Sequence, residues 1–109
     1  MTKARRRAPG RPVVAGATTH VFRLFVAGKE LNSAQARANL VRLCEEYLKG
    51  RYRIETVDVL KDAAAAHECN ILLTPTLILL KPRPMVTVYG NLSDTARVLA
   101  VLRLNGEKR

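Results

Sequence analysis

The chain has 109 residues, which is enough for one small domain. Its hydrophobic content of 48% is normal for a globular core and excludes a wholly disordered chain. No uninterrupted apolar run approaches the roughly 18 residues of a membrane span, and no long apolar segment follows the basic start as in a secretory signal. We therefore expect a cytoplasmic protein without a membrane partner.

Half of the net charge of +10 lies in residues 1–20, which hold five basic side chains and no acid. This segment is rich in Pro, Gly, Ala and Arg and has no helical or strand periodicity, which predicts a flexible basic arm. Such an arm can bind nucleic acid or an acidic protein surface, or it can only keep the protein soluble. The solvated arm is the favoured interpretation, because the rest of the chain lacks the aromatic-rich basic platform of RNA and single-stranded DNA binders.

The first regular segment, residues 20–27 (HVFRLFVA), is almost entirely apolar and predicts a central strand covered on both faces. Residues 28–31 form a turn. A β-branched segment, residues 52–60 (YRIETVDVL), predicts a second strand. Because a helix separates these strands, they should lie parallel, joined by a right-handed crossover.

The predicted helix between these strands begins at Asn32 or Ser33, either of which can act as its N-cap. Gln35 lies three residues after Asn32, where a capping box requires it. We expect the helix to run to about Lys49, with Gly50 ending it. Its apolar stripe at helical spacing consists of Ala36, Leu40, Leu43, Cys44, Tyr47 and Leu48.

The second half of the chain begins with a short alanine-rich helix over residues 63–69, capped by Asp62. Residues 76–81 and 85–89 predict two further strands. Only Pro82-Arg83-Pro84 separates them, which is too short for a crossover, so these strands should form an antiparallel hairpin.

A turn at residues 90–92 leads to the last predicted helix, capped by Ser93 or Asp94 and stopped by Asn105-Gly106. Its apolar residues are Val98, Leu99, Val101 and Leu102. The folded domain should therefore span residues 21–106, between the basic arm at 1–20 and a short tail at 107–109.

The predicted order β-α-β-α-β-β-α is the thioredoxin-like layout of the α/β class. It implies a four-stranded mixed sheet with strand order 2-1-3-4, flanked by helices. Proteins with this layout have a cis-proline just before the third strand. Pro75 occupies that position in Thr74-Pro75-Thr76, so we expect a cis bond there.

The sequence argues against redox catalysis. Thioredoxin-like redox proteins carry a reactive cysteine at the start of the first helix, where the helix dipole lowers the thiol pKa. Residues 28–34 contain no cysteine, and Cys44 lies two to three turns further on. Cys44 and Cys69 form no CxxC motif, so two buried or partly buried thiols of a reducing compartment are expected.

The sequence also gives little support for a nucleophilic active site, a metal site or a cofactor site. Ser33 has no base nearby in the sequence and is better explained as a helix cap. His20 and His67 are isolated histidines without a matching acid or cysteine at ligand spacing, so no metal or cofactor is expected. Asn91-Leu92-Ser93 matches a glycosylation sequon, but we interpret it as a turn followed by a helix cap. The sequence thus predicts a binding module rather than an enzyme.

The chain contains five short stretches in this order: LFVAG (24–28), Asn32-Ser33, VDVLKD (57–62), LTPTL (73–77) and GNLSD (90–94). Together they resemble the KaiB family of bacterial clock proteins, and the resemblance covers about residues 21–104. It implies a non-enzymatic regulator that binds a KaiC-like ATPase of the RecA-like class and modulates its phosphorylation cycle or signalling output.

For the partner-binding surface we predict Asp58, Lys61 and Asp62 at the end of the second strand, together with Asn32 and Ser33. The alternative for the same stretch is that Val59 and Leu60 are core residues beside merely solvated charges. Three other functions stay open: a stress-response or chaperone-like adaptor, a kinase-sensor relative, and nucleic-acid binding by the arm. Self-association into a dimer or tetramer is also open.

The resemblance further implies that three prolines determine the fold: Pro75, Pro82 and Pro84. Clock-type KaiB proteins rearrange their C-terminal half between a tetrameric fold and a thioredoxin-like fold, which requires two packings of similar free energy. Here Arg83 interrupts the family's three successive prolines. Val101 and Arg103 replace a glycine and an acid of the last helix, and both replacements favour a helix. We therefore expect this chain to be held mostly in the thioredoxin-like fold.

Overall fold

A computed structural model describes residues 19–104. The predicted arm up to residue 18, the helix stop at 105–106 and the tail at 107–109 lie outside the described residues. The elements are β1 (His20–Val26), α1 (Leu31–Tyr47), β2 (Tyr52–Asp58), α2 (Ala63–Glu68), β3 (Thr76–Lys81), β4 (Val86–Tyr89) and α3 (Thr95–Val101).

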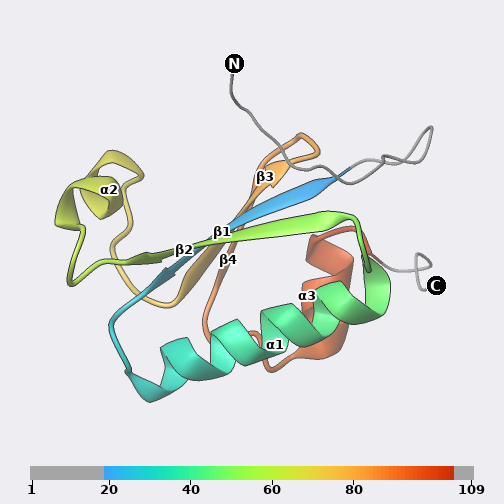
Figure 1. The fold of residues 1–109 in the computed structure, drawn as a ribbon, viewed down its shortest axis with the longest axis horizontal. Helices are drawn as coiled ribbons and strands as arrows, with labels where there is room; N and C mark the ends of the chain where they lie inside the picture. Colours follow the sequence, from blue (N-terminus) through green and yellow to red (C-terminus); the bar gives the residue numbers. More distant parts are fainter. Residues whose placement is uncertain (1–18, 105–109) are drawn as a thin grey trace.

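The four strands form one mixed sheet with the order β2-β1-β3-β4 (Figure 1). β1 and β2 are parallel, in a register that runs from His20 opposite Tyr52 to Val26 opposite Asp58. β3 is antiparallel to β1, and β4 is antiparallel to β3. The predicted thioredoxin-like topology, with β1 parallel to β2 and an antiparallel β3–β4 hairpin, is confirmed.

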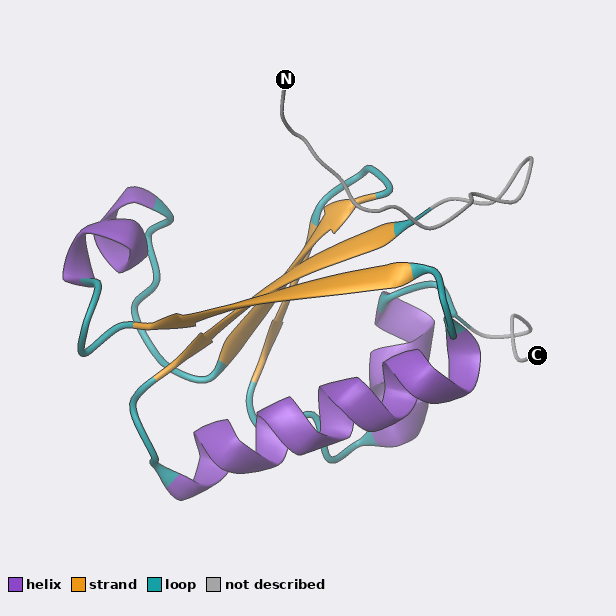
Figure 2. Cartoon of the chain, in the orientation of Figure 1, coloured by secondary structure: helices purple, strands orange, loops and turns teal. Residues whose placement is uncertain are grey.

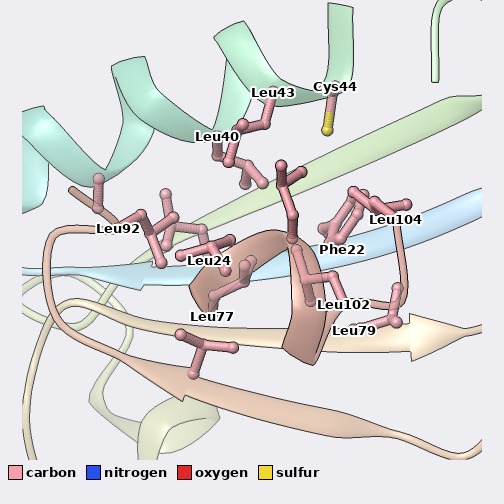
Figure 3. Packing of buried hydrophobic residues seen from close by; sticks show 14 of the residues in the cluster. Phe22, Leu24, Leu40, Leu43, Cys44, Leu77, Leu79, Leu92, Leu102 and Leu104 are labelled. Carbon is pink, nitrogen blue, oxygen red and sulfur yellow. The ribbon is translucent and has the colours of Figure 1, made fainter. Parts of the chain in front are cut away.

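The helices α1 and α3 lie side by side on one face of the sheet, and α2 lies beyond one end of the strands (Figure 2). Among the described residues, no helix is long and apolar enough to cross a membrane. The main core lies between the sheet and α1 and α3, where the predicted stripe of α1 faces the strands (Figure 3). Its members include Phe22, Leu24, Leu40, Leu43, Cys44, Leu48, Leu77, Leu79, Val98 and Leu102.

The opposite face of the sheet is only partly covered, contrary to the expectation for β1. Phe25 and Ile78 are buried there, whereas Arg23 is half-buried and pairs with Glu55, with Nε and Oε1 2.8 Å apart. The short α2 lies beyond one end of the strands and leaves the rest of this face open. We call it the open face.

The N-cap of α1 is Glu30, not Asn32 or Ser33 as predicted. The Glu30 carboxylate accepts hydrogen bonds from the backbone N–H groups of Asn32 and Ser33, at 3.0 and 2.9 Å. The Ser33 hydroxyl is used elsewhere, since it accepts from the Ala27 N–H at 3.1 Å. Gln35 forms no capping box and accepts from the Asn91 amide instead, at 3.0 Å.

Several element ends also differ from the prediction. α1 ends at Tyr47 rather than near Lys49. β2 ends at Asp58, because the Asp58 carbonyl accepts from the N–H groups of Lys61 and Asp62 and turns the chain. The predicted strand residues Val59 and Leu60 therefore lie in a turn, and β4 begins at Val86 instead of Met85.

The end of α3 corrects the prediction that Arg103 lies in the last helical turn. The helix ends at Val101, and Arg103 follows it with φ +62°. The N–H groups of Arg103 and Leu104 bond to the carbonyls of Ala100 and Leu99, which is a Schellman motif. Arg103 Nη2 also donates to the Pro82 carbonyl at 3.2 Å, so this side chain links the helix end to the hairpin turn.

The predicted cis bond at Thr74–Pro75 is confirmed, and Lys81–Pro82 and Arg83–Pro84 are also cis. The predicted pairing of the valine-rich segment is confirmed as well, with Val88 opposite Leu77 in β4 and β3. The C-terminal half therefore has the thioredoxin-like arrangement.

Leu40→Ala tests this core. Leu40 is 1% exposed, and its loss should lower the free energy of unfolding by about 2–5 kcal/mol, because apolar burial is lost and a cavity remains. The control is Val41→Ala on the same helix, where the side chain is 42% exposed and the cost should stay below about 1 kcal/mol. Urea unfolding measures both, and equal costs would contradict the described orientation of α1.

Candidate partner-binding site

The predicted site residues gather at one end of the sheet because β1 and β2 are parallel. Both strands end there, α1 and α2 begin there, and the antiparallel β3 starts from the same edge (Figure 1). Three segments form this end: residues 28–32, which include the start of α1, residues 58–62, which include the end of β2, and residues 72–73. We call them together the carboxyl-end surface.

A side chain at the end of β2 joins the first two of these loops. Asp58 Oδ1 accepts hydrogen bonds from the N–H of Gly28, after β1, and from the N–H of Leu60, in its own turn, both at 3.0 Å. These two N–H groups, the Gly28 one first, hold the pKa of the Asp58 carboxyl below its usual range, and the charge of Lys61 adds to the effect. The two loops are therefore held together by an ionised carboxylate.

Gly28 is suited to its place in this junction for two reasons. Its φ of +54° lies in the left-handed region, which favours glycine. A Cβ added there would also lie 3.1 Å from Leu60 Cδ1, so a larger residue would displace the leucine. Gly28 thus lets Leu60 lie across the β1–α1 loop.

The start of α1 is fixed by a second carboxylate. The Ser33 hydroxyl donates to Glu30 Oε1 at 3.0 Å, and the Asn32 and Ser33 N–H groups hold the pKa of Glu30 below its usual range. Ser33 itself is fully buried. Its hydroxyl bonds to Glu30 and to the Ala27 N–H and so holds the loop in place. A partner would contact the neighbouring residues rather than Ser33.

Large apolar side chains are exposed on the carboxyl-end surface. Leu60 is 74% exposed and Leu72 is 92% exposed, and Leu31 and Leu73 are also more than half exposed. The alternative that Leu60 belongs to the core is therefore wrong, while Val59 is half-buried. Exposed large apolar side chains, several of them at one end of the molecule, are typical of interaction surfaces.

The polar predicted residues lie at the same end of the sheet as these leucines. Lys61 and Asp62 are exposed, and Asp62 also caps α2 by accepting from the Ala65 N–H at 3.1 Å. Asn32 is exposed at the other side, where its Oδ1 accepts from the Asn91 side chain at 3.4 Å. The structure thus brings Asp58, Lys61 and Asp62 together in one turn, with Asn32 across the β1–α1 loop.

The exposed leucines and the Glu30 cap were not predicted from the sequence. Leu72 and Leu73 lie between α2 and β3, just before Pro75 and outside any strand. This position is the one sequence signal that could have indicated their exposure. Nothing local distinguishes Leu60 from a strand residue. Its exposure depends on the turn that Asp58 makes.

Neither cysteine belongs to the three segments of this surface. Burial, with a smaller effect of the neighbouring Glu45, raises the pKa of the Cys44 thiol to about 12, so this thiol stays protonated at neutral pH. Cys69 is the residue that ends α2. Among residues 19–104, no three His, Cys, Asp or Glu side chains are grouped as a metal ion would require.

Comparison with known families agrees with this geometry. The family model of the KaiB domain matches residues 23–104. The chain belongs to the KaiB family. It is 42% identical to circadian clock protein KaiB3 of Synechocystis over 79 residues, which is 72% of this chain and 78% of that protein. It is also 42% identical to the circadian clock oscillator protein KaiB of Nostoc over 86 residues, covering 79% and 80% of the two chains.

Solved structures extend the likeness at the level of the fold. Mitochondrial thioredoxin 3 of Saccharomyces cerevisiae superposes with a TM-score of 0.63 at 20% identity, over 80% of each chain. Chloroplastic thioredoxin z superposes with a TM-score of 0.66 at 18% identity, over 84% of this chain and 82% of that one. The KaiB relatives are named as clock proteins, not as enzymes.

The raised pKa of Cys44 predicts a stability loss in alkali. In the unfolded chain the thiol should titrate near its ordinary pKa of 9.0, whereas in the folded chain it stays protonated to about 12. Above pH 9 the unfolded state therefore binds fewer protons, and the free energy of unfolding should fall by up to about 1.4 kcal/mol per pH unit. Urea unfolding between about pH 8 and pH 10.5 measures the slope. Cys44→Ala should show a shallower slope, and equal slopes would contradict the burial of this thiol.

Proposed function

We propose that this KaiB-family protein is a non-catalytic regulator that binds a KaiC-like ATPase of the RecA-like class through the carboxyl-end surface. Its binding would modulate the phosphorylation cycle or signalling output of that ATPase. The observation that carries the proposal is the exposure of several leucines at the end of the sheet that also carries the turn of Asp58, Lys61 and Asp62, in a chain of this family.

The chemistry of the carboxyl-end surface supports binding over catalysis. Thioredoxin-like redox proteins carry their reactive cysteine at the start of the first helix, but residues 28–34 here contain none. The only hydroxyl at that helix start is Ser33, which is buried and bonded to Glu30 and the Ala27 N–H. Because the low pKa of Glu30 makes it a weak base, Ser33 has no partner that could activate it.

The composition of the surface also fits a protein partner. Leu60 and Leu72 offer apolar area for the centre of an interface, where most binding energy is concentrated. Lys61 and Asp62 lie at the side of that area, where charges steer association rather than supply affinity. The Asp58 junction holds two of the contributing loops in place before the partner arrives, which reduces the entropy lost on binding.

The proposal is tested by binding of the full chain to the KaiC-like ATPase of its host, immobilised and supplied with ATP. The unmodified chain should bind. Lys61→Glu should lower the association rate about three- to tenfold at low salt and much less at high salt, because an exposed charge is screened.

The matched control is Lys49→Glu, the same charge reversal at an exposed residue beyond the other end of α1. It should change the association rate by less than about twofold, since it lies a helix length from the surface. Equal effects of the two reversals would indicate long-range attraction without this site, and absence of binding by the unmodified chain would contradict the proposed function.

A further inference from the structure

The end of the sheet opposite the carboxyl-end surface carries basic side chains from three stretches of the chain. β1 and β2 begin at this end, and β3, α1 and α3 end there (Figure 1). We call it the basic end. Because a strand of seven residues spans about 20 Å, the basic end is well separated from the carboxyl-end surface. Its basic residues are Lys49, Arg51, Arg53, Lys81, Arg83 and Arg103.

Two of these residues lie in one row across the sheet. Val21 of β1 has Arg53 of β2 opposite on one side and Lys81 of β3 on the other. Residues paired across neighbouring strands point to the same face, so the side chains of Arg53 and Lys81 share the open face, with backbones about 10 Å apart. Both residues are exposed. They can therefore contact two separate anionic groups of one ligand.

Two further arginines are held in place by backbone carbonyls. Arg51 Nη2 donates to the Tyr47 carbonyl at 3.3 Å, and Arg103 Nη2 donates to the Pro82 carbonyl at 3.2 Å. Each guanidinium keeps other N–H groups for a ligand, because it carries five donors. Side chains held before binding lose less conformational entropy when a ligand arrives.

The positive charge of the basic end is largely uncompensated. Within the part of the chain that the structure describes, none of the six basic residues forms an ion pair. The acids at this end are Glu45 and Glu46, in the last turn of α1. Glu45 accepts a hydrogen bond from the Tyr52 hydroxyl. Six positive charges therefore lie beside two negative ones.

The predicted basic arm is attached at the same end. Residues 1–18 lie outside the described residues, and the chain enters β1 from residue 19. The arm adds five basic side chains and no acid. The sequence showed no basic surface that such an arm could extend, whereas the fold supplies one at the point of attachment.

We infer that the basic end binds the phosphate backbone of duplex nucleic acid and that the attached arm extends this contact. Four of the six basic residues at this end and four of the five in the arm are arginines, which can hold a phosphate through two hydrogen bonds. A DNA duplex presents one negative charge per about 1.7 Å of its axis, so it can engage several of them at once. The inference is independent of the proposed function, because the carboxyl-end surface stays free for its own partner.

The uncharged side chains of the basic end favour a duplex over a single strand or a lipid surface. Proteins that bind single strands stack the bases on exposed aromatic rings, but Tyr47 and Tyr52, the tyrosines at this end, are half-buried. Binding to a membrane surface usually buries several apolar side chains. Among the described residues of the basic end, Met85 is the one large apolar side chain that is exposed. The contacts should therefore be to the backbone and independent of base sequence.

Fluorescence anisotropy of a labelled DNA duplex of about 20 base pairs, titrated with the full chain, tests the inference. The logarithm of the association constant should fall linearly with the logarithm of salt concentration, with a slope of about −4 to −6, and a duplex of different sequence should bind equally well. The double variant Arg53→Gln/Lys81→Gln should weaken binding about tenfold at low salt and make the slope shallower by about 2.

The matched control is Lys29→Gln/Arg37→Gln, which removes the same two charges at exposed residues near the start of α1. It should change the affinity less than about threefold and leave the slope unchanged. Equal effects of the two double variants would show attraction by overall charge alone, and no effect of either would show binding by the arm alone. Each of these results would overturn the inference. Tighter binding to a single strand of the same length, or to vesicles containing phosphatidylserine, or no binding to the duplex, would overturn it too.

Discussion

The structure depends on the parallel pairing of β1 with β2, which places the ends of two strands and the starts of two helices at the same edge. Asp58 links this strand pairing to the loops that form the surface. Its backbone carbonyl ends β2 by accepting from Lys61 and Asp62, and its carboxylate bonds to the Gly28 N–H across the strand boundary. Because of this turn, Leu60 leaves the sheet and lies over Gly28, exposed rather than buried.

In redox proteins of this fold, the same end of the sheet carries the reactive cysteine. This chain has no cysteine in residues 28–34, at the corresponding helix start. The start of the first helix carries the Glu30 carboxylate instead of a thiol, Asp58 lies at the end of β2 nearby, and both carboxylates accept from backbone N–H groups. Glu30 caps α1, and Asp58 joins two loops. A surface built from such fixed loops and exposed leucines suits recognition of a protein partner, as the KaiB family assignment indicates.

Much of the fold could be predicted from the sequence because its signals are local. The three residues between the last two strands are too few for a crossover, so the hairpin followed from length alone. The strand order, the stripe of α1 and the cap at Asp62 followed from periodicity and from known topology. The cap of α1 was missed because Ser33 has a competing acceptor role toward the Ala27 N–H, a contact that the sequence does not reveal.

Two further predictions, for Leu60 and Arg103, were wrong because they also depend on hydrogen bonds that the sequence does not reveal. Leu60 was predicted to be a strand residue because it ends a β-branched segment, and only the hydrogen bonds of Asp58 turn it outward. Arg103 was placed in the last helical turn, where a basic residue suits the dipole, but the Schellman motif ends the helix two residues earlier and leaves Arg103 beside the hairpin turn. Of the predicted site residues, Asp58, Lys61 and Asp62 lie together in one turn, whereas the exposure of the leucines could be seen only in the folded chain.

We propose that Asp58 holds the carboxyl-end surface in the geometry that binds the partner. The most direct test of this proposal is calorimetric titration of the KaiC-like ATPase with Asp58→Ala, compared with Glu45→Ala, which removes the carboxylate that accepts from the Tyr52 hydroxyl near the start of β2. Both variants lose one negative charge and one side-chain acceptor. We predict that Asp58→Ala weakens binding about tenfold or more, because the two loops separate, and that Glu45→Ala binds like the unmodified chain. Equal affinities of Asp58→Ala and the unmodified chain would contradict the account.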